Sequence, residues 1–212
     1  AGGTESMSML PMMGHKTVLN YNIASEHPDY YIGMGLTAEE VAKKYEITRD
    51  EQDAFALSSH QKALAAQAAG HFDASIVPIN VSENYFDAAS GKKKTRTWTV
   101  SKDEGPRADT TIEALGKLKP VFAMGGSVTA GNASGLNDGA AAMYIASENA
   151  VKSYNLTPKA RIVSSAVVGV EPRIMGIGPV GATQKALQKA GLTLNDMDLI
   201  EFNEAFSAQC LA

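Results

Sequence analysis

The segment whose residue types best suit chemistry spans residues 127–142 and reads Ser-Val-Thr-Ala-Gly-Asn-Ala-Ser-Gly-Leu-Asn-Asp-Gly-Ala-Ala-Ala. Three glycines and two asparagines stand there among small residues, so the backbone can approach a ligand closely and no large side chain obstructs it. The same composition suits a tight bend between two elements. The residues alone therefore leave two interpretations open for this segment, a binding loop and a plain turn.

A second group with chemical potential lies near the end of the sequence. Asn203 follows a short apolar strand candidate, residues 199–202, and precedes an expected final helix. An amide in that place is a rigid hydrogen-bond donor and acceptor. Asparagine also caps helices well, so both interpretations of Asn203 stay open.

The sequence has few cysteines and histidines that could act as nucleophile, base or metal ligand. The single cysteine, Cys210, has no histidine close to it in sequence, and a buried structural thiol is the favoured interpretation. His60 lies on an expected helix and is interpreted as an exposed or hydrogen-bonded side chain. The histidines lack metal-ligand spacing with each other or with cysteine, so no metal site is predicted.

The composition excludes several classes of function. The 212 residues are 44% hydrophobic and carry a net charge of −4, with no face dominated by positive charge, which argues against a nucleic-acid partner. The basic run at residues 92–94 is interpreted as a solvated turn. No run approaches the roughly 20 apolar residues of a membrane span. One cysteine permits no internal disulfide and fits a reducing compartment, the cytoplasm or an organellar matrix.

The elements that position these residues fall into two parts. Residues 1–36 are expected to be loop-rich. Capping boxes at Thr37 and Thr48 predict two helices, the second ending at Gly70. Strands are then expected at residues 76–81 and 95–100, with a turn between them at 87–91, and a short helix is expected at 112–115.

The second part alternates strands with helices. We expect a buried apolar strand at 139–145, a helix at 148–154, a strand at 161–170 and an amphipathic helix at 181–190. This order predicts an α/β layer with a largely parallel sheet. The first residues, Ala-Gly-Gly-Thr, include no initiator methionine and no signal peptide, and they suggest a chain that starts within a fold.

Five motifs in order resemble those of the thiolase family across essentially the whole chain. They are Gly-Gly-Thr-Glu-Ser-Met-Ser at 2–8, Met-Gly-Leu-Thr-Ala-Glu at 34–39, the glycine-rich segment, Met-Gly-Ile-Gly-Pro at 175–179 and Asn-Glu-Ala-Phe-Ser-Ala-Gln at 203–209. The resemblance implies an α/β chain that forms part of a five-layer αβαβα fold with an inserted α+β loop domain. Thiolases consist of two similar α/β halves. The resemblance places the end of the N-terminal half at 1–13, the loop domain at 14–136, the return to the N-terminal half at 137–158 and the first part of the C-terminal half at 159–212.

The resemblance also implies an activity. Thiolases are acyltransferases that cleave or form 3-ketoacyl-CoA, with coenzyme A as a substrate and no covalently bound cofactor. This chemistry needs a nucleophile, a base and oxyanion donors. The family's nucleophilic cysteine, its Gly-His-Pro histidine and its second cysteine have no counterpart in this sequence, and Cys210 matches none of them. We therefore expect the chain alone to be inactive and the complete protein to be a homodimer or homotetramer.

Individual residues match the family's functional positions. Asn203 matches the residue that holds the oxyanion-hole water, and Arg107 matches an arginine near the adenine-phosphate end of coenzyme A. Ser134 matches the residue that hydrogen-bonds the pantetheine arm. The other implied contacts are the coenzyme A walls Ala130, Ala133, Leu136, Met34, Leu118 and Phe122 and the acyl-pocket residues Met175 and Phe206.

Two departures leave the acyl chain length open. Gly33 stands where many acetoacetyl-specific members have histidine, and Gly105 stands where the family has tyrosine. Both changes remove bulk near the ligand. Acetoacetyl-CoA and longer 3-ketoacyl-CoA substrates are therefore both compatible with the sequence.

Alternatives from other classes remain. Residues 176–181 match the G-x-G-x-x-G pattern of dinucleotide-binding oxidoreductases, and acidic residues follow about twenty positions later. However, residues 171–175 separate the glycines from the expected strand, and Pro179 lacks a backbone N–H. A non-catalytic coenzyme A or acyl-binding module is the other alternative. A serine hydrolase is excluded, because Ser134 stands one place too late for G-x-S-x-G.

Overall fold

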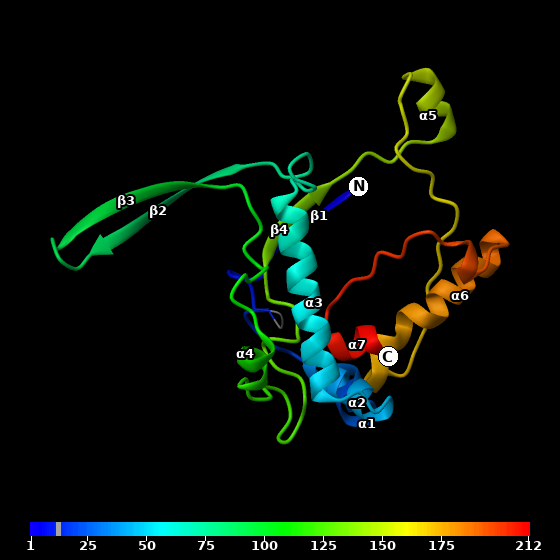
Figure 1. Ribbon diagram of the computed structural model, residues 1–212, viewed down its shortest axis with the longest axis horizontal. Helices are drawn as coiled ribbons and strands as arrows, with labels where there is room; N and C mark the ends of the chain where they lie inside the picture. The colour runs from blue at the N-terminus through cyan, green and yellow to red at the C-terminus, as the bar shows by residue number, and fades with distance from the viewer. Residues whose placement is uncertain (12–13) are drawn as a thin grey trace.

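The computed structural model describes residues 1–11 and 14–212 and centres on the long helix α3 (Arg49–Ala68) (Figure 1). The predicted capping box begins this helix: Thr48 Oγ1 accepts a hydrogen bond from Glu51 N–H at 3.3 Å, and Glu51 Oε2 accepts one from Thr48 N–H at 2.8 Å. Both bonds satisfy backbone N–H groups at the helix start that would otherwise lack partners. The prediction for this helix is confirmed.

The neighbouring helix α2 (Met34–Lys44) begins earlier than predicted. Gly33 is its N-cap, so Thr37 lies inside the helix, and its hydroxyl donates to the Met34 carbonyl oxygen at 2.7 Å. A threonine one turn into a helix commonly bonds back in this way. The capping box predicted at Thr37 was therefore wrong.

A small core joins α2, α3 and the segments that contact them. The 3₁₀ segment η2 (Pro172–Ile177) and the final helix α7 (Ser207–Leu211) contact α2, while α4 (Ile112–Gly116) contacts α3. The buried apolar side chains are small or medium-sized: Ala38, Val41, Ala42, Ala56, Leu115, Val128, Ile174 and Ala208. Small side chains let helices approach closely, so this core fixes the N-terminal half of α3 against α4 and α7.

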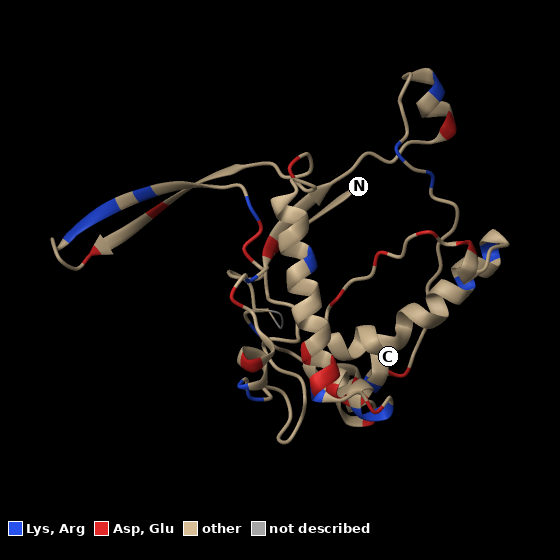
Figure 2. Cartoon of the chain, in the orientation of Figure 1, with Lys and Arg blue, Asp and Glu red and all other residues tan. Residues whose placement is uncertain are grey.

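Two antiparallel strand pairs complete the regular structure. Strand β1 (Gly2–Ser6) pairs with β4 (Asp138–Ala142), and β2 (Ile79–Asp87) pairs with β3 (Lys92–Val100). The β2–β3 hairpin projects away from the helices, and positive charge gathers on β3 (Figures 1 and 2). The basic run at 92–94 is exposed, as expected, but it begins strand β3 and does not form a turn. The turn predicted just before it is correct, and Gly91 there has φ +64°.

The largely parallel sheet is not observed among the described residues. Residues 161–170 and 199–202 do not form strands, and β4 is exposed along its length, although a buried apolar strand was predicted there. A strand exists only where another strand supplies hydrogen-bond partners. In the part of the chain that the structure describes, no such partner lies beside these two segments.

The remaining helices are short except one. They are α1 (Tyr21–Glu26), η1 (Pro28–Tyr31), α5 (Glu148–Ser153), α6 (Gly178–Ala190) and η3 (Leu194–Asp196). Helices α1 and η1 lie in the region that was predicted to be loop-rich. Helices α5 and α6 were predicted, and α6 ends at Gly191 as expected. In the described residues no helix is long and apolar enough to cross a membrane.

The G-x-G-x-x-G pattern does not form a dinucleotide-binding turn. Its first glycine, Gly176, lies in η2, and η2 continues directly into α6. That fingerprint requires a strand that leads into the first glycine and a tight turn into the helix. The alternative of a dinucleotide-dependent oxidoreductase therefore loses its structural basis.

Candidate functional site

The glycine-rich segment is held at its start by one carboxylate. Glu39 of α2 accepts hydrogen bonds from Ser127 N–H at 2.9 Å and from Val128 N–H at 2.9 Å. Gly126 permits this approach, because a Cβ on that residue would lie 2.2 Å from Glu39 Oε1. The segment is thus attached directly to the rigid core.

Its middle is held by a buried polar network. Asn132, which is 3% exposed, accepts a hydrogen bond from Thr129 N–H at 2.8 Å and donates to Asp53 Oδ1 at 3.0 Å. Gln52 Nε2 of the same helix as Asp53 donates to Ser127 Oγ at 2.9 Å. Gln52 Oε1 is buried without a hydrogen-bond partner, whereas the paired groups of Asn132 and Asp53 are satisfied, and such pairs rigidify a loop. The binding-loop interpretation therefore has the fixed backbone it requires.

A groove of about 560 Å³ lies between α3, the residues around Arg107, α4 and the glycine-rich segment. Five residues from the predicted coenzyme A set line this groove: Arg107, Leu118, Ala130, Ala133 and Ser134. They come from three separate parts of the chain, and tertiary structure brings them together. The walls of the groove mix small apolar and polar groups, as ligand pockets do.

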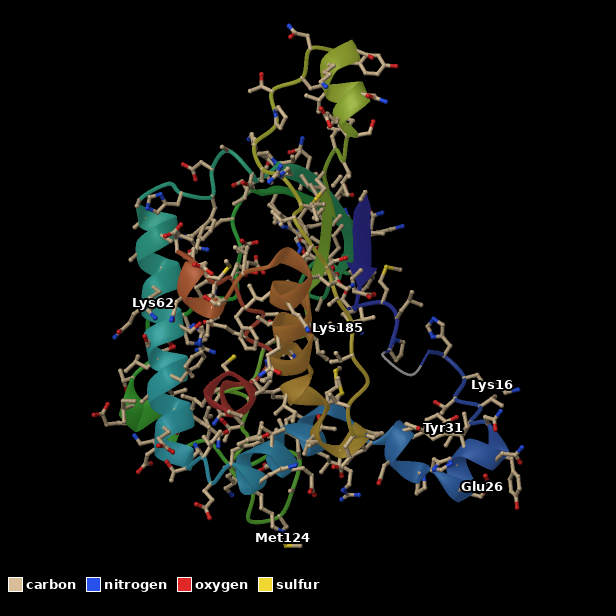
Figure 3. All side chains as sticks on the ribbon, turned by 90° about the vertical axis from the view of Figure 1, so that its right-hand side faces the viewer. Lys16, Glu26, Tyr31, Lys62, Met124 and Lys185 are labelled. Atoms are coloured by element: carbon tan, nitrogen blue, oxygen red, sulfur yellow. The ribbon has the colours of Figure 1, made fainter. Side chains whose placement is uncertain are left out.

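The other predicted ligand contacts do not line the groove. Met34, Leu136 and Phe122 lie outside it and are partly or largely exposed, as is Met175, which was predicted for the acyl pocket. Phe206 lies close by: its backbone bridges to Ala133, and its ring stands edge-on to that of Phe122 at 6.2 Å. Figure 3 shows Met124 at the exposed tip of the loop between α4 and the glycine-rich segment.

Arg107 presents a charged group at the groove. Its guanidinium contacts Asp109 at 3.1 Å and 3.2 Å, which raises the pKa of Arg107 and lowers the pKa of Asp109. Both side chains are exposed, so the guanidinium remains open to an anionic ligand. A planar guanidinium suits phosphate oxygens.

Two neighbouring residues of α3 were missed as site residues. Ser59 and His60 line the groove; the Ser59 hydroxyl donates to Glu204, and His60 Nδ1 accepts a hydrogen bond from Arg107 N–H at 3.1 Å. The sequence did indicate that His60 is exposed or hydrogen-bonded, and that is confirmed. Ser59 shares this wall of the groove with the α3 residues Phe55, Ala56 and Ala63.

Asn203 lies on an exposed stretch that reaches the glycine-rich segment. Just after it, the Ala205 carbonyl accepts from Ser134 N–H at 2.8 Å, and Ser207 N–H donates to the Asn132 carbonyl at 3.0 Å. Helix α7 begins only at Ser207, with Phe206 as its N-cap. Asn203 is therefore not a helix cap, and its exposed side chain is free of that structural role.

Cys210 is a poor nucleophile in this structure. Partial burial, and to a smaller degree the charge of Glu204, raise the pKa of its thiol from 9.0 to about 11. Since the thiolate is the reactive form, little of it exists near neutral pH. In the described part of the chain, no group of three His, Cys, Asp or Glu side chains could hold a metal ion.

Family comparisons cover nearly the whole sequence. Residues 1–149 match the family model described as Thiolase, N-terminal domain, and residues 156–212 match the one described as Thiolase, C-terminal domain. A 3-ketoacyl-CoA thiolase of Bacillus subtilis is 47% identical over 211 residues, and an acetyl-CoA acetyltransferase of Escherichia coli is 49% identical over 227 residues. All of this chain is covered, but only 54% and 55% of those relatives.

Solved structures give the same result. The crystal structure of human mitochondrial 3-ketoacyl-CoA thiolase matches with a TM-score of 0.81 and 46% identity, over 99% of this chain and 54% of that chain. The structure of that enzyme in complex with CoA matches with a TM-score of 0.80 and 45% identity, over 99% of this chain and 52% of that chain. The chain thus spans about half the length of the proteins it matches.

Proposed function

Because the chain belongs to the thiolase family and adopts part of its α/β fold, we propose that it forms the coenzyme A-binding part of an acyltransferase acting on 3-ketoacyl-CoA. The reaction is CoA-dependent cleavage of the substrate or, in reverse, its Claisen formation. Acetoacetyl-CoA and longer chains both remain candidate substrates, since glycine stands at 33 and 105, where the family resemblance implies bulkier residues.

The groove between α3 and the glycine-rich segment is the observation that carries this proposal. A nucleotide phosphate is proposed to bind Arg107, whose guanidinium is exposed at the groove. The pantetheine arm then follows the small and apolar side chains of Leu118, Ala130 and Ala133, with Ser134 as its hydrogen-bond partner. Coenzyme A, with its anionic end and mostly uncharged arm, fits this polarity.

The outer contacts are proposed around the arm and the acyl end. Phe206 is proposed as a contact at the acyl end, and its backbone bridge to Ala133 beside the groove supports this. Met34, Leu136, Phe122 and Met175 are proposed as further apolar contacts. Asn203 is proposed to hold the water that stabilises the thioester oxyanion, and its freedom from a capping role supports this. Cys210 is not proposed as the nucleophile, because its pKa of about 11 disfavours the thiolate.

The organisation of the complete protein is also a proposal. We propose the division at residues 1–13, 14–136, 137–158 and 159–212, of which the boundary at 13 lies outside the described residues. The β2–β3 hairpin and α3 then both belong to the loop domain. A homodimer or homotetramer in the cytoplasm or an organellar matrix is proposed on the family resemblance.

Titration of coenzyme A tests the proposal. We expect the wild-type protein to bind CoA and Arg107→Ala to raise the dissociation constant about tenfold, the cost of one charge-assisted contact of about 1.4 kcal/mol. Arg161→Ala, which changes an exposed arginine outside the groove, is the matched control and should bind normally. Absence of CoA binding, or normal binding by Arg107→Ala, would contradict the assigned site. Binding without turnover by the full-length protein would favour a non-catalytic acyl-binding module.

A further inference from the structure

Two consecutive residues of α3 bind two different loops of the groove. The Ser59 hydroxyl donates to the Glu204 carboxylate, next to Asn203, and His60 Nδ1 accepts from the backbone N–H of Arg107 at 3.1 Å. The segments that carry Arg107 and Glu204 descend on the two sides of α3 (Figure 1). A single turn of helix thus touches both the proposed phosphate contact and the proposed oxyanion segment.

The hydrogen bond fixes the orientation of the His60 ring. Its Nδ1 faces the backbone N–H of Arg107 and accepts the bond from it at 3.1 Å. The contact goes to the Arg107 backbone and not to its side chain, which binds Asp109 instead. His60 therefore acts on the position of the Arg107 loop.

The helix that carries both residues is well fixed. Its first turn has the Thr48 capping box, and Gln52 and Asp53 in the next turn are buried at 0% and 3% exposure. Adjacent residues on a helix diverge by about 100° around its axis, so one rigid backbone can direct Ser59 and His60 to separate loops. Such support is what holds a site in its working geometry.

We propose that Ser59 and His60 are positioning residues that set the separation between the phosphate contact at Arg107 and the oxyanion segment at Asn203. This inference rests on the proposed function. Ser59 holds the oxyanion segment through Glu204, and His60 holds the loop of Arg107. The two roles separate kinetically, because one affects the developing charge and the other affects binding of coenzyme A.

The test uses substitutions in the full-length protein, with turnover and CoA dissociation constants measured for each. Ser59→Ala should lower kcat about tenfold and leave the CoA dissociation constant within about twofold, whereas His60→Leu should raise the dissociation constant about five- to tenfold with kcat nearly unchanged. Ser58→Ala, a change on the same helix outside the groove, is the matched control and should alter neither.

A conservative variant separates positioning from packing. In His60→Asn the amide oxygen Oδ1 stands where Nδ1 stood and can still accept the Arg107 N–H, so this variant should bind CoA like the wild type. Hydrogen exchange of the Arg107 amide should be fast in His60→Leu and slow in His60→Asn, and this readout holds even for a variant that loses activity.

The outcomes distinguish this inference from the proposed function. If the wild-type protein fails to bind CoA, the proposed function and this inference both fall. If it binds CoA but Ser59→Ala and His60→Leu change kcat and the dissociation constant by the same factors, or His60→Asn behaves like His60→Leu, the positioning roles alone are overturned.

Discussion

The side-chain amide of Asn132 donates a hydrogen bond to Oδ1 of Asp53 at 3.0 Å, between residues 79 positions apart in the sequence. Asp53 Oδ2 also accepts from Arg49 Nε at 2.7 Å, and the Arg49 guanidinium donates to the carbonyl oxygens of Leu115 and Leu118. One buried carboxylate of α3 therefore connects the glycine-rich segment, α3 and the end of α4. These are three of the walls of the groove.

Loss of this contact should destabilise the protein. Asn132→Ala leaves Asp53 Oδ1 and the Thr129 N–H without a partner in a buried place, and we expect a loss of about 1–3 kcal/mol in the free energy of unfolding. Urea denaturation measures it, with Asn22→Ala at an exposed position as the control. Equal midpoints for the two variants would show that the network adds little to stability.

Substitution of Asn203 should affect catalysis more than binding. In the full-length enzyme, Asn203→Ala should lower turnover about 10²–10³-fold and change CoA affinity little, because the water it is proposed to hold acts on charge that develops in the transition state. Steady-state kinetics and CoA titration measure the two effects. Unchanged turnover would remove the role assigned to Asn203.

The single cysteine should react slowly in the folded chain. With its pKa raised to about 11, Cys210 should be alkylated by iodoacetamide at pH 8 about 10- to 100-fold more slowly than in the urea-unfolded chain, and the rate should rise with pH toward 11. Mass spectrometry follows the reaction. Glu204→Gln should accelerate it, since the charge of Glu204 is the second cause of the shift. Equal rates in the folded and unfolded chains would contradict the assigned environment.

The capping box of α3 should make stability depend on pH. Hydrogen bonds from the Thr48 backbone N–H and then from its hydroxyl lower the pKa of Glu51 below its ordinary 4.5. The resulting stabilisation is present above pH 4.5 and is lost as the pH falls through the lowered value. Urea midpoints of the wild type and of Glu51→Gln should therefore differ at about pH 7 and approach each other as the pH falls through the lowered pKa of Glu51. A difference that persists at low pH would exclude the ionised carboxylate as its source.

A side chain at Gly35 should destabilise the protein. A Cβ at this position in α2 would lie 2.2 Å from a ring carbon of Phe122, so Gly35→Ala must displace the ring, at a cost of about 1–3 kcal/mol. Gly116→Ala is the control, because nothing lies within 4 Å of a Cβ there. Thermal unfolding of both variants measures the effect, and similar midpoints would show that the ring moves freely.

The local elements of this protein follow largely from its sequence. The capping box at Thr48, the turn that ends at Gly91 and the stop of α6 at Gly191 depend on residues within one turn of each other, and all three were predicted correctly. The five motifs, in their order along the chain, are enough to indicate the thiolase family. The helix cap predicted at Thr37 was wrong. For Asn203 the sequence left open whether the side chain caps a helix, and the structure shows that it does not.

Other features were decided by the tertiary structure alone. Residues 161–170 have the composition of a strand, yet a strand requires hydrogen-bond partners from elsewhere in the fold, and no sequence pattern shows whether they are present. The contacts from Asn132 to Asp53 and from His60 to Arg107 join residues 79 and 47 positions apart. Sequence periodicity reaches only a few residues, whereas the groove is assembled by packing between distant segments, so only the folded chain reveals which side chains share it.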